Sequence, residues 1–262
     1  MRGGSMKHMA MLAITVGAGL IGLANRAEAQ IPTRVMVRVT ANDAKIIGSG
    51  VGGARITIRD AVTGEVLVEG VQEGSTGDTG LIMGSRERGA TVYETDGAAG
   101  FLAEISLSQP TQVLITGEGP LDTPHAMQAT ARSLLLVPGR HVLGEGVILE
   151  LLGFKVELLS PEGGAELEAG VPVQVRGRIT MLCGCPTEPG GIWDSSEYEV
   201  LVQAVRDGEV IGEWPMEFAD RTSHYAGSIS LDEPGDVELR MLAIDPDKAN
   251  FGMATTVVRV LD

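Results

Sequence analysis

The chain has 262 residues and carries 20 Lys or Arg against 35 Asp or Glu, a formal net charge of −15. A surface this acidic repels phosphate backbones and anionic lipid, which excludes nucleic acid and an anionic membrane face as expected partners. Aromatic residues are only 3% and glycines number 36. The residues left to form regular structure are mainly aliphatic and β-branched, and such residues favour strands. We therefore expect an all-β protein with many turns and short strands.

The first 29 residues have the three-part pattern of a cleavable signal peptide. Arg2 and Lys7 precede an apolar run, and Ala27-Glu28-Ala29 supplies a small-x-small cleavage site. The run has about fifteen residues, whereas a membrane span needs roughly 20. The pattern therefore predicts cleavage near Ala29, a periplasmic or secreted protein, and no membrane span in the mature chain.

Residues 30–153 show the two-residue period of half-buried strands. A Gly-rich stretch between residues 70 and 95 interrupts this pattern, and the best helix signal covers residues 119–136, where prolines limit any helix to about three turns. The expected strands cover residues 35–40, 54–60, 65–69, 101–107, 111–116, 133–137 and 146–152.

Three motifs in this first module resemble the carboxypeptidase regulatory-like, or transthyretin-like, family of exported bacterial proteins. They are Gly53-Ala54-Arg55-Ile56-Thr57-Ile58, Asp60-Ala61-Val62-Thr63-Gly64-Glu65 and Thr95-Asp96-Gly97-Ala98-Ala99-Gly100-Phe101. The resemblance implies a β-sandwich for residues 30–153. The chain departs from the family by about 25 extra residues between Gly70 and Thr95, which puts any inherited binding role in doubt.

Residues 154–262 resemble a bacterial immunoglobulin-like domain at both ends. The opening matches over residues 156–165 and 171–177, and the end matches over residues 234–245, 250–252 and 255–260. With middle strands expected at residues 197–205 and 225–231, the segment suits a sandwich of about seven strands. The two cysteines are two residues apart and cannot bridge the sheets, so its core must depend on apolar burial.

The most distinctive segment is residues 181–194, a Gly- and Pro-rich loop that holds both cysteines. In an oxidising compartment Cys183 and Cys185 form a local disulfide or a redox-active pair. Together with Met181 they also offer three soft sulfur ligands for copper. We favour the structural disulfide, because no Met-rich or His-rich tract accompanies them. Trp193 and Asp194, at the end of the loop, are candidates for binding a partner; for Trp193 the alternative, which we favour, is packing at the core or edge of the sandwich.

A second candidate site lies in the turn that contains Asp245, Asp247 and Asn250. Their side-chain oxygens could bind calcium. The alternative, which we favour, is a turn in which these side chains bond their own backbone.

Three other motifs suggest an enzyme or a cofactor site, but the residues around each of them exclude that interpretation. The glycines of residues 48–53 precede a strand, whereas a dinucleotide site needs a helix there. Asp78-Thr79-Gly80 lacks the symmetric partner that an aspartic protease requires. The histidines at 125, 141 and 224 lie in separate segments without a nucleophile motif. We therefore expect no catalytic residues and no required cofactor.

The sequence as a whole predicts a non-catalytic, exported protein of two β-sandwich modules that acts as an accessory, adhesion or interaction module in the bacterial envelope, with a protein partner. The alternative is a periplasmic copper-binding or thiol-redox protein that uses the Cys-Gly-Cys loop. Fold resemblance alone is a weak warrant for either function.

Overall fold

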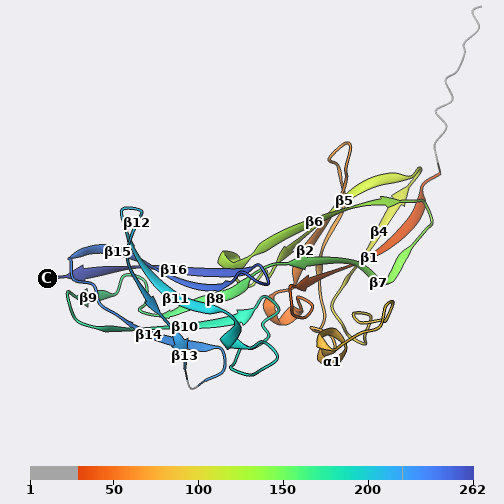
Figure 1. The fold of residues 1–262 in the computed structure, drawn as a ribbon. Helices are drawn as coiled ribbons and strands as arrows, with labels where there is room; N and C mark the ends of the chain where they lie inside the picture. Colours follow the sequence, from red (N-terminus) through yellow and green to blue (C-terminus); the bar gives the residue numbers. More distant parts are fainter. Residues whose placement is uncertain (1–28, 220) are drawn as a thin grey trace, which may run out of the picture.

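The structure is a computed structural model that describes residues 29–219 and 221–262. Residues 1–28, which hold most of the expected export signal, lie outside the described part. Two groups of strands lie end to end along an elongated molecule (Figure 1). The longest helix of the described residues, α1 (Thr79–Met83), has five residues. The expectation of an all-β sandwich fold is confirmed.

The N-terminal module packs a three-stranded sheet, in the order β4-β1-β7, against a four-stranded sheet, in the order β3-β2-β5-β6. Alternation places Val35, Val37 and Val39 of β1 in the core, where each is fully buried. The strands are β1 (Ile31–Ala41), β2 (Ala54–Asp60), β3 (Val66–Gln72), β4 (Phe101–Leu107), β5 (Thr111–Gly119), β6 (Gln128–Leu136) and β7 (Val142–Leu151).

The C-terminal module packs the sheet β13-β14-β10-β8 against the sheet β12-β11-β15-β16-β9. The inward row of β15 is Val237, Leu239, Met241 and Ala243, all within 1% of complete burial. The strands are β8 (Phe154–Ser160), β9 (Glu166–Glu168), β10 (Val173–Met181), β11 (Glu199–Arg206), β12 (Glu209–Pro215), β13 (Glu217–Phe218), β14 (His224–Ile229), β15 (Gly235–Asp245) and β16 (Asn250–Leu261).

The helix signal over residues 119–136 is wrong. The structure has only the short 3-10 turn η2 (Pro124–Ala126) there, and β6 takes up the rest. The reason is tertiary: β6 pairs with β5 in an unbroken antiparallel register from Gln128 to Leu136, and this pairing overrides local helix propensity.

The Gly-rich stretch of residues 70–95 forms a small subdomain on the N-terminal module, and it contains α1. The Asp78 carboxylate accepts a hydrogen bond from the amide of Leu81 at 2.9 Å and caps the helix, so the protease-like triplet is a helix start. Ile82 and Val92 pack with Ile46 and Ala99 in a small apolar cluster of their own. The stretch is therefore ordered by burial.

A buried amide side chain joins the two sheets of the N-terminal module. Gln72, at the end of β3, is completely buried. Its Oε1 accepts from Val39 N at 2.7 Å, while its Nε2 donates to Val39 O at 2.9 Å and to Ile47 O at 2.8 Å. The side chain thus completes backbone hydrogen bonding between β3 and β1, which belong to different sheets.

We predict that Gln72→Leu lowers the free energy of unfolding by about 2–4 kcal/mol, because it removes the bonds that Gln72 makes to the Val39 amide and the Ile47 carbonyl and leaves Val39 O with only its bond from Ile47 N. Urea denaturation measures the loss. The matched control is Gln112→Leu on the exposed side of β5, expected to change stability by less than about 0.5 kcal/mol. Equal effects of the two substitutions would contradict the role given to Gln72.

Candidate functional site

The two modules share one continuous apolar core at the joint between them. The cluster that fills both sandwiches also includes Ala44 and Val51 from the N-terminal module and Cys183, Cys185 and Trp193 from the loop after β10. Because these side chains exclude water between the modules, the joint is a packed interface.

Trp193 lies in this interface. Its side chain is only 9% exposed, and the indole N–H donates to the backbone carbonyl of Asp43 at 2.9 Å. At the other end of the loop, Gly184 takes φ +78°, and a Cβ built on it would lie 2.8 Å from a methyl carbon of Val51. Only glycine fits this approach. Trp193, a candidate for binding a partner, is thus already engaged by the N-terminal module.

Hydrogen bonds hold the rest of the loop to β10 and β14. The Thr187 hydroxyl donates to Ile179 O at 2.8 Å and also bonds the hydroxyl of Tyr225, which in turn bonds that of Tyr198. Burial raises the pKa of the Tyr198 phenol above its usual value, so the ring stays neutral. Asp194 caps the 3-10 turn η3 (Ser195–Glu197), because its Oδ1 accepts from the amide and the hydroxyl of Ser196.

Cys183 and Cys185 are joined as a disulfide in this structure, with their Cα atoms 5.4 Å apart. Each cysteine is 4% exposed and Met181 is 3% exposed. Copper binds cysteine as the thiolate, so the three sulfurs could serve as ligands only after reduction. Burial also restricts access of any exchange partner to the disulfide.

The turn between β15 and β16 uses its oxygens internally. Asp245 Oδ1 accepts from the amide of Lys248 at 3.1 Å. Asn250 Oδ1 accepts from Gly153 N at 2.8 Å and from Asn42 Nδ2 at 3.3 Å. Asp245 thus makes the local bond of the turn that the sequence favours and Asn250 bonds other segments, whereas the Asp247 carboxylate has no such bond in the described residues.

Lys248 links the modules electrostatically. Its ammonium lies 2.6 Å from Glu197 Oε2 and 2.9 Å from Asp43 Oδ2. The hydrogen bond to Glu197, opposed by partial burial and assisted by Asp43, raises the pKa of Lys248 above its usual value. Lys248 O also accepts from Asn42 Nδ2 at 2.6 Å, so this residue contacts the N-terminal module through both its backbone and its side chain.

The structure brings together the two sites that the sequence places 60 residues apart. Met181, Trp193 and Asp194 share one small cavity with Asp245 and Asn250. Its volume of about 10 Å³ is that of a single water molecule. The predicted site residues of the loop and of the turn therefore meet at the joint, around a space of about one water molecule.

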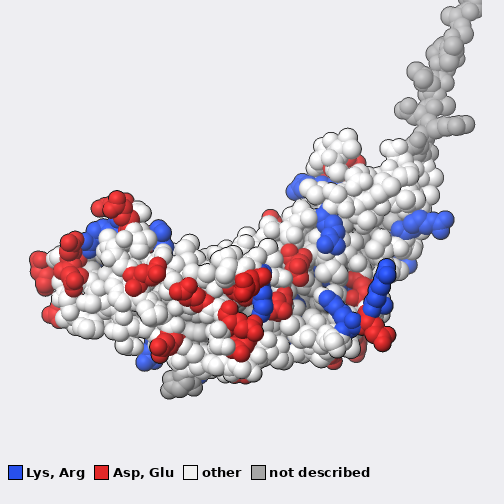
Figure 2. All heavy atoms as spheres, viewed as in Figure 1, with Lys and Arg blue, Asp and Glu red and all other residues white. Residues whose placement is uncertain are grey.

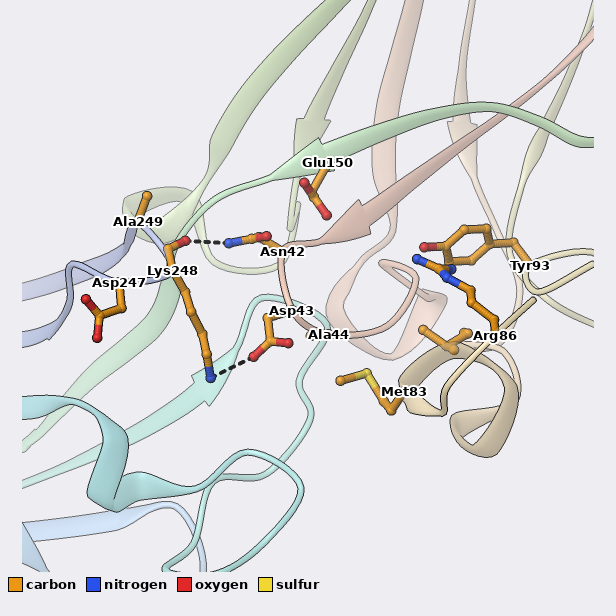
Figure 3. A pocket seen from close by; sticks show the side chains of 11 residues that line it. Asn42, Asp43, Ala44, Met83, Arg86, Tyr93, Glu150, Asp247, Lys248 and Ala249 are labelled. Carbon is orange, nitrogen blue, oxygen red and sulfur yellow. Dashed lines mark hydrogen bonds and ion pairs between the residues drawn. The ribbon is translucent and has the colours of Figure 1, made fainter. Parts of the chain in front are cut away.

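A much larger cleft opens beside the joint, with a volume of about 600 Å³ (Figure 3). Four segments far apart in the sequence line it: the turn after β1, the subdomain of residues 70–95, β7 and the β15–β16 turn. Its walls are formed by Asn42, Asp43, Ala44, Ile82, Met83, Arg86, Tyr93, Glu150, Asp247, Lys248 and Ala249. A cleft of this size, built from both modules, is typical of a binding site.

The charges in the cleft are unequal. Lys248 and Asp43 neutralise each other, and Arg86 lies over the ring of Tyr93 with its guanidinium carbon 6.0 Å from the ring centre. Glu150 and Asp247 make no ion pair with any described residue. Acidic side chains also gather at the end of the molecule that carries the C-terminus (Figure 2). The cleft therefore offers two free carboxylates beside an apolar and aromatic wall.

Glu145 on β7 positions the segment that carries Tyr93, which forms part of the cleft wall. Its carboxylate accepts from the amides of Val92, Tyr93 and Glu94 at 2.8–3.0 Å. Partial burial opposes the charge, but the three amides and nearby Arg38 hold the pKa of Glu145 below its usual value. Arg38 is buried and donates to the carbonyl of Ala99 at 2.6 Å. Glu145 on β7 and Arg38 on β1 thus hold residues 92–99 of the chain against these two strands.

Sequence reasoning did not find Glu145, Glu150 or Tyr93, because no motif or periodicity sets them apart. The described residues contain no group of three or more His, Cys, Asp or Glu side chains placed to hold a metal ion. Within the same residues, no helix is long and apolar enough to cross a membrane.

No family model matches the sequence, and no curated protein matches it. Among solved structures, an engineered protein is 17% identical over 48% of this chain and 24% of its own, with a TM-score of 0.32. The fibronectin(III)-like modules of Clostridium thermocellum CbhA are 13% identical over 88% of this chain and 93% of theirs, at 0.26. Domains 4 and 5 of the S-layer protein SbsC are 9% identical over 89% and 100%, at 0.28. At these sequence identities and TM-scores, no function of these proteins is assigned to this chain.

We predict that Glu145→Gln weakens the attachment of residues 92–94 to β7, since a charge-assisted hydrogen bond contributes about 1.5–3 kcal/mol. Tryptic cleavage after Arg86 and Arg88 should then be about tenfold faster. Because the pKa of Glu145 is lowered, its stabilisation is complete above the usual value of about 4.3 and is lost as pH falls through the folded value.

The protection factors of the Val92 and Tyr93 amides, that is, their exchange rates relative to the intrinsic rate at each pH, should accordingly stay high at neutral pH and fall only below the usual glutamate value of about 4.3. The matched control is Glu150→Gln, on the same strand but without a bond to these amides. If this control exposes Arg86 to trypsin as much as Glu145→Gln does, the positioning role of Glu145 is refuted.

We predict that purified protein has no titratable thiol in the absence of reductant. We also predict that it retains no copper after it has been exposed to copper and dialysed. The variant Cys183→Ser/Cys185→Ser should fold and lose only about 2 kcal/mol in urea denaturation, because the disulfide closes a very short loop. Tight, stoichiometric copper binding by the untreated protein would instead favour a metal role for Met181, Cys183 and Cys185.

Proposed function

We propose that this chain is an exported, non-catalytic interaction protein, and that the cleft between its two β-sandwich modules binds a protein partner in the bacterial envelope. The cleft itself is the observation on which the proposal depends. It combines walls from both modules around a volume of about 600 Å³, and a packed joint fixes its shape. A preformed cleft loses little conformational freedom on binding.

The free groups in the cleft suggest the chemistry of that partner. Glu150 and Asp247 favour a Lys or Arg side chain, and Met83 with the Tyr93 ring favours an apolar neighbour of it. A partner segment with a basic residue beside apolar ones matches both. The acidic chain attracts such a segment at long range as well, because charge complementarity speeds encounter.

A non-catalytic role is consistent with the histidines. His125 bonds Val156 O at 2.8 Å, His141 accepts from Arg34 N at 3.1 Å and His224 bonds Thr222 O at 2.9 Å. Each is engaged by backbone in a different part of the chain, and none lies beside a nucleophile in the described residues. None of the three therefore has the setting of a catalytic base.

The proposal extends to family and location. We assign residues 30–153 to a carboxypeptidase regulatory-like module and residues 154–262 to an immunoglobulin-like module, on the motifs that each resembles. We place the mature protein in the periplasm or outside the cell, on the signal pattern that ends near Ala29. The disulfide of Cys183 with Cys185 supports an oxidising compartment.

We predict that reversing the free charges of the cleft, Glu150→Lys with Asp247→Lys, abolishes capture of the partner. The test is a pull-down from envelope extract with immobilised wild-type and variant protein. Like charges facing the partner's basic residue should cost several kcal/mol.

The control, Glu168→Lys with Glu209→Lys, makes the same change in net charge on exposed residues of β9 and β12. A protein captured by wild type and by this control, but not by the cleft variant, is the expected result. If both variants lose the same protein, net charge explains capture and the cleft does not.

A further inference from the structure

A second hollow lies on the C-terminal module, on the outer face of the sheet that contains β10 and β14. Its volume is about 320 Å³. Arg176 comes from β10, His224, Tyr225 and Ala226 come from β14, and Ala219 and Arg221 come from the segment between β13 and β14. Arg176 stands directly opposite Ala226 in the antiparallel register. The hollow exists because this cross-strand neighbour of the long arginine is small.

The pattern of ion pairs singles out this hollow. The C-terminal module has eight Lys or Arg residues. Six of them contact a carboxylate within 3.0 Å: Lys155, Arg178, Arg206, Arg240, Lys248 and Arg259. The other two, Arg176 and Arg221, pair with no carboxylate of the described residues. Both of them line the same hollow.

The remaining groups around the hollow are also suited to an anion. No carboxylate is among the described residues that line it. His224 bonds the carbonyl of Thr222 through Nδ1, and its Nε2 has no partner within the described residues. In a chain of net charge −15, two guanidinium groups and an imidazole thus line one hollow to which none of the described residues contributes a carboxylate.

We propose that Arg176, Arg221 and His224 form a binding site for an oxyanion, that is, a carboxylate, sulfate or phosphate group. A guanidinium presents its N–H donors in a planar fork that matches the oxygens of such groups in pairs. Two forks that converge on one concave surface can contact the oxyanion from two sides. The site does not depend on the inter-module cleft, because all of its residues belong to β10, β14 and the segment before β14.

The surface beside the hollow indicates what else the ligand carries. An adjoining hollow of about 360 Å³ shares Ala226 and is lined by Gln174, Trp214, Glu217 and Ser228, with Pro215 and Gly227. These side chains offer hydrogen bonds and one aromatic ring, but no Lys or Arg. Because the Glu217 carboxylate lies in this second hollow, the ligand class that fits both hollows has an oxyanion at one end and a polar body that donates hydrogen bonds beside it.

The test titrates isotope-labelled protein with sodium acetate, sodium sulfate or sodium phosphate, each at an ionic strength held constant with sodium chloride. Amide chemical shifts in the NMR spectrum report binding at His224 and Ala226, and calorimetry gives the affinity. Saturable shifts at these amides that sodium chloride alone does not cause are expected. A response to acetate identifies a carboxylate ligand, and a response to sulfate or phosphate alone identifies a tetrahedral one.

The variants Arg176→Gln and Arg221→Gln should each weaken binding by about tenfold or more, which is the fold-change for one charge-assisted hydrogen bond. Both side chains lie on the surface, so circular dichroism should show an unchanged fold. Arg176→Lys keeps the charge but loses the fork, and it should bind more weakly than wild type.

The matched control is Arg259→Gln, which removes an arginine that already pairs with Asp236. It should bind as wild type does, and so should the cleft variant Glu150→Lys/Asp247→Lys. The proposal is overturned if none of the three anions shifts the amides of His224 and Ala226, or if Arg176→Gln and Arg221→Gln bind as tightly as Arg259→Gln.

Discussion

The arrangement of the two modules depends on a buried amide at their joint. Asn250 is completely buried, and its Oδ1 accepts from the linker at Gly153 and from Asn42 of the N-terminal module. One side chain therefore fixes the end of β16, the linker and the turn after β1. Both bonds are made by the same oxygen to different parts of the chain, so their geometry opposes rotation of one module against the other. Because both modules line the cleft beside the joint, the same bonds also fix the shape of the cleft.

The joint also explains why chemically unusual residues cluster. The disulfide closes within the loop, the Asp245 carboxylate bonds Lys248 of its own turn, and Trp193 bonds Asp43 of the other module. A small, tightly turned loop can carry an aromatic anchor to a neighbouring module only if the loop itself is rigid. The disulfide, the Thr187 hydroxyl and the Asp194 cap supply that rigidity. Residues that suggest metal or redox chemistry in the sequence serve, in the fold, to hold two sandwiches together.

The sequence predicted the strands well where one face is buried. The expected strand at residues 101–107 coincides with β4, and Val35, Val37 and Val39 alternate inward as expected. Prediction failed for residues 119–136, because pairing with β5 decides the conformation of β6 and the local sequence does not. The cleft could not be predicted at all. Asn42, Arg86, Glu150 and Asp247 meet only through the joint, and no spacing in the sequence records that contact.

Charge alone does not mark a binding site on a protein surface. An exposed ion pair contributes roughly 0–1 kcal/mol, so an exposed charge without a partner is not unusual in water. What distinguishes the cleft and the arginine hollow is that side chains without an ion pair among the described residues line a concave place. These are Glu150 and Asp247 in the cleft, where Arg86 lies over the Tyr93 ring, and Arg176 with Arg221 in the hollow. Bringing like charges together is unfavourable unless something of opposite sign binds there. The folded chain maintains both groupings through independent elements, which argues that each has its own ligand.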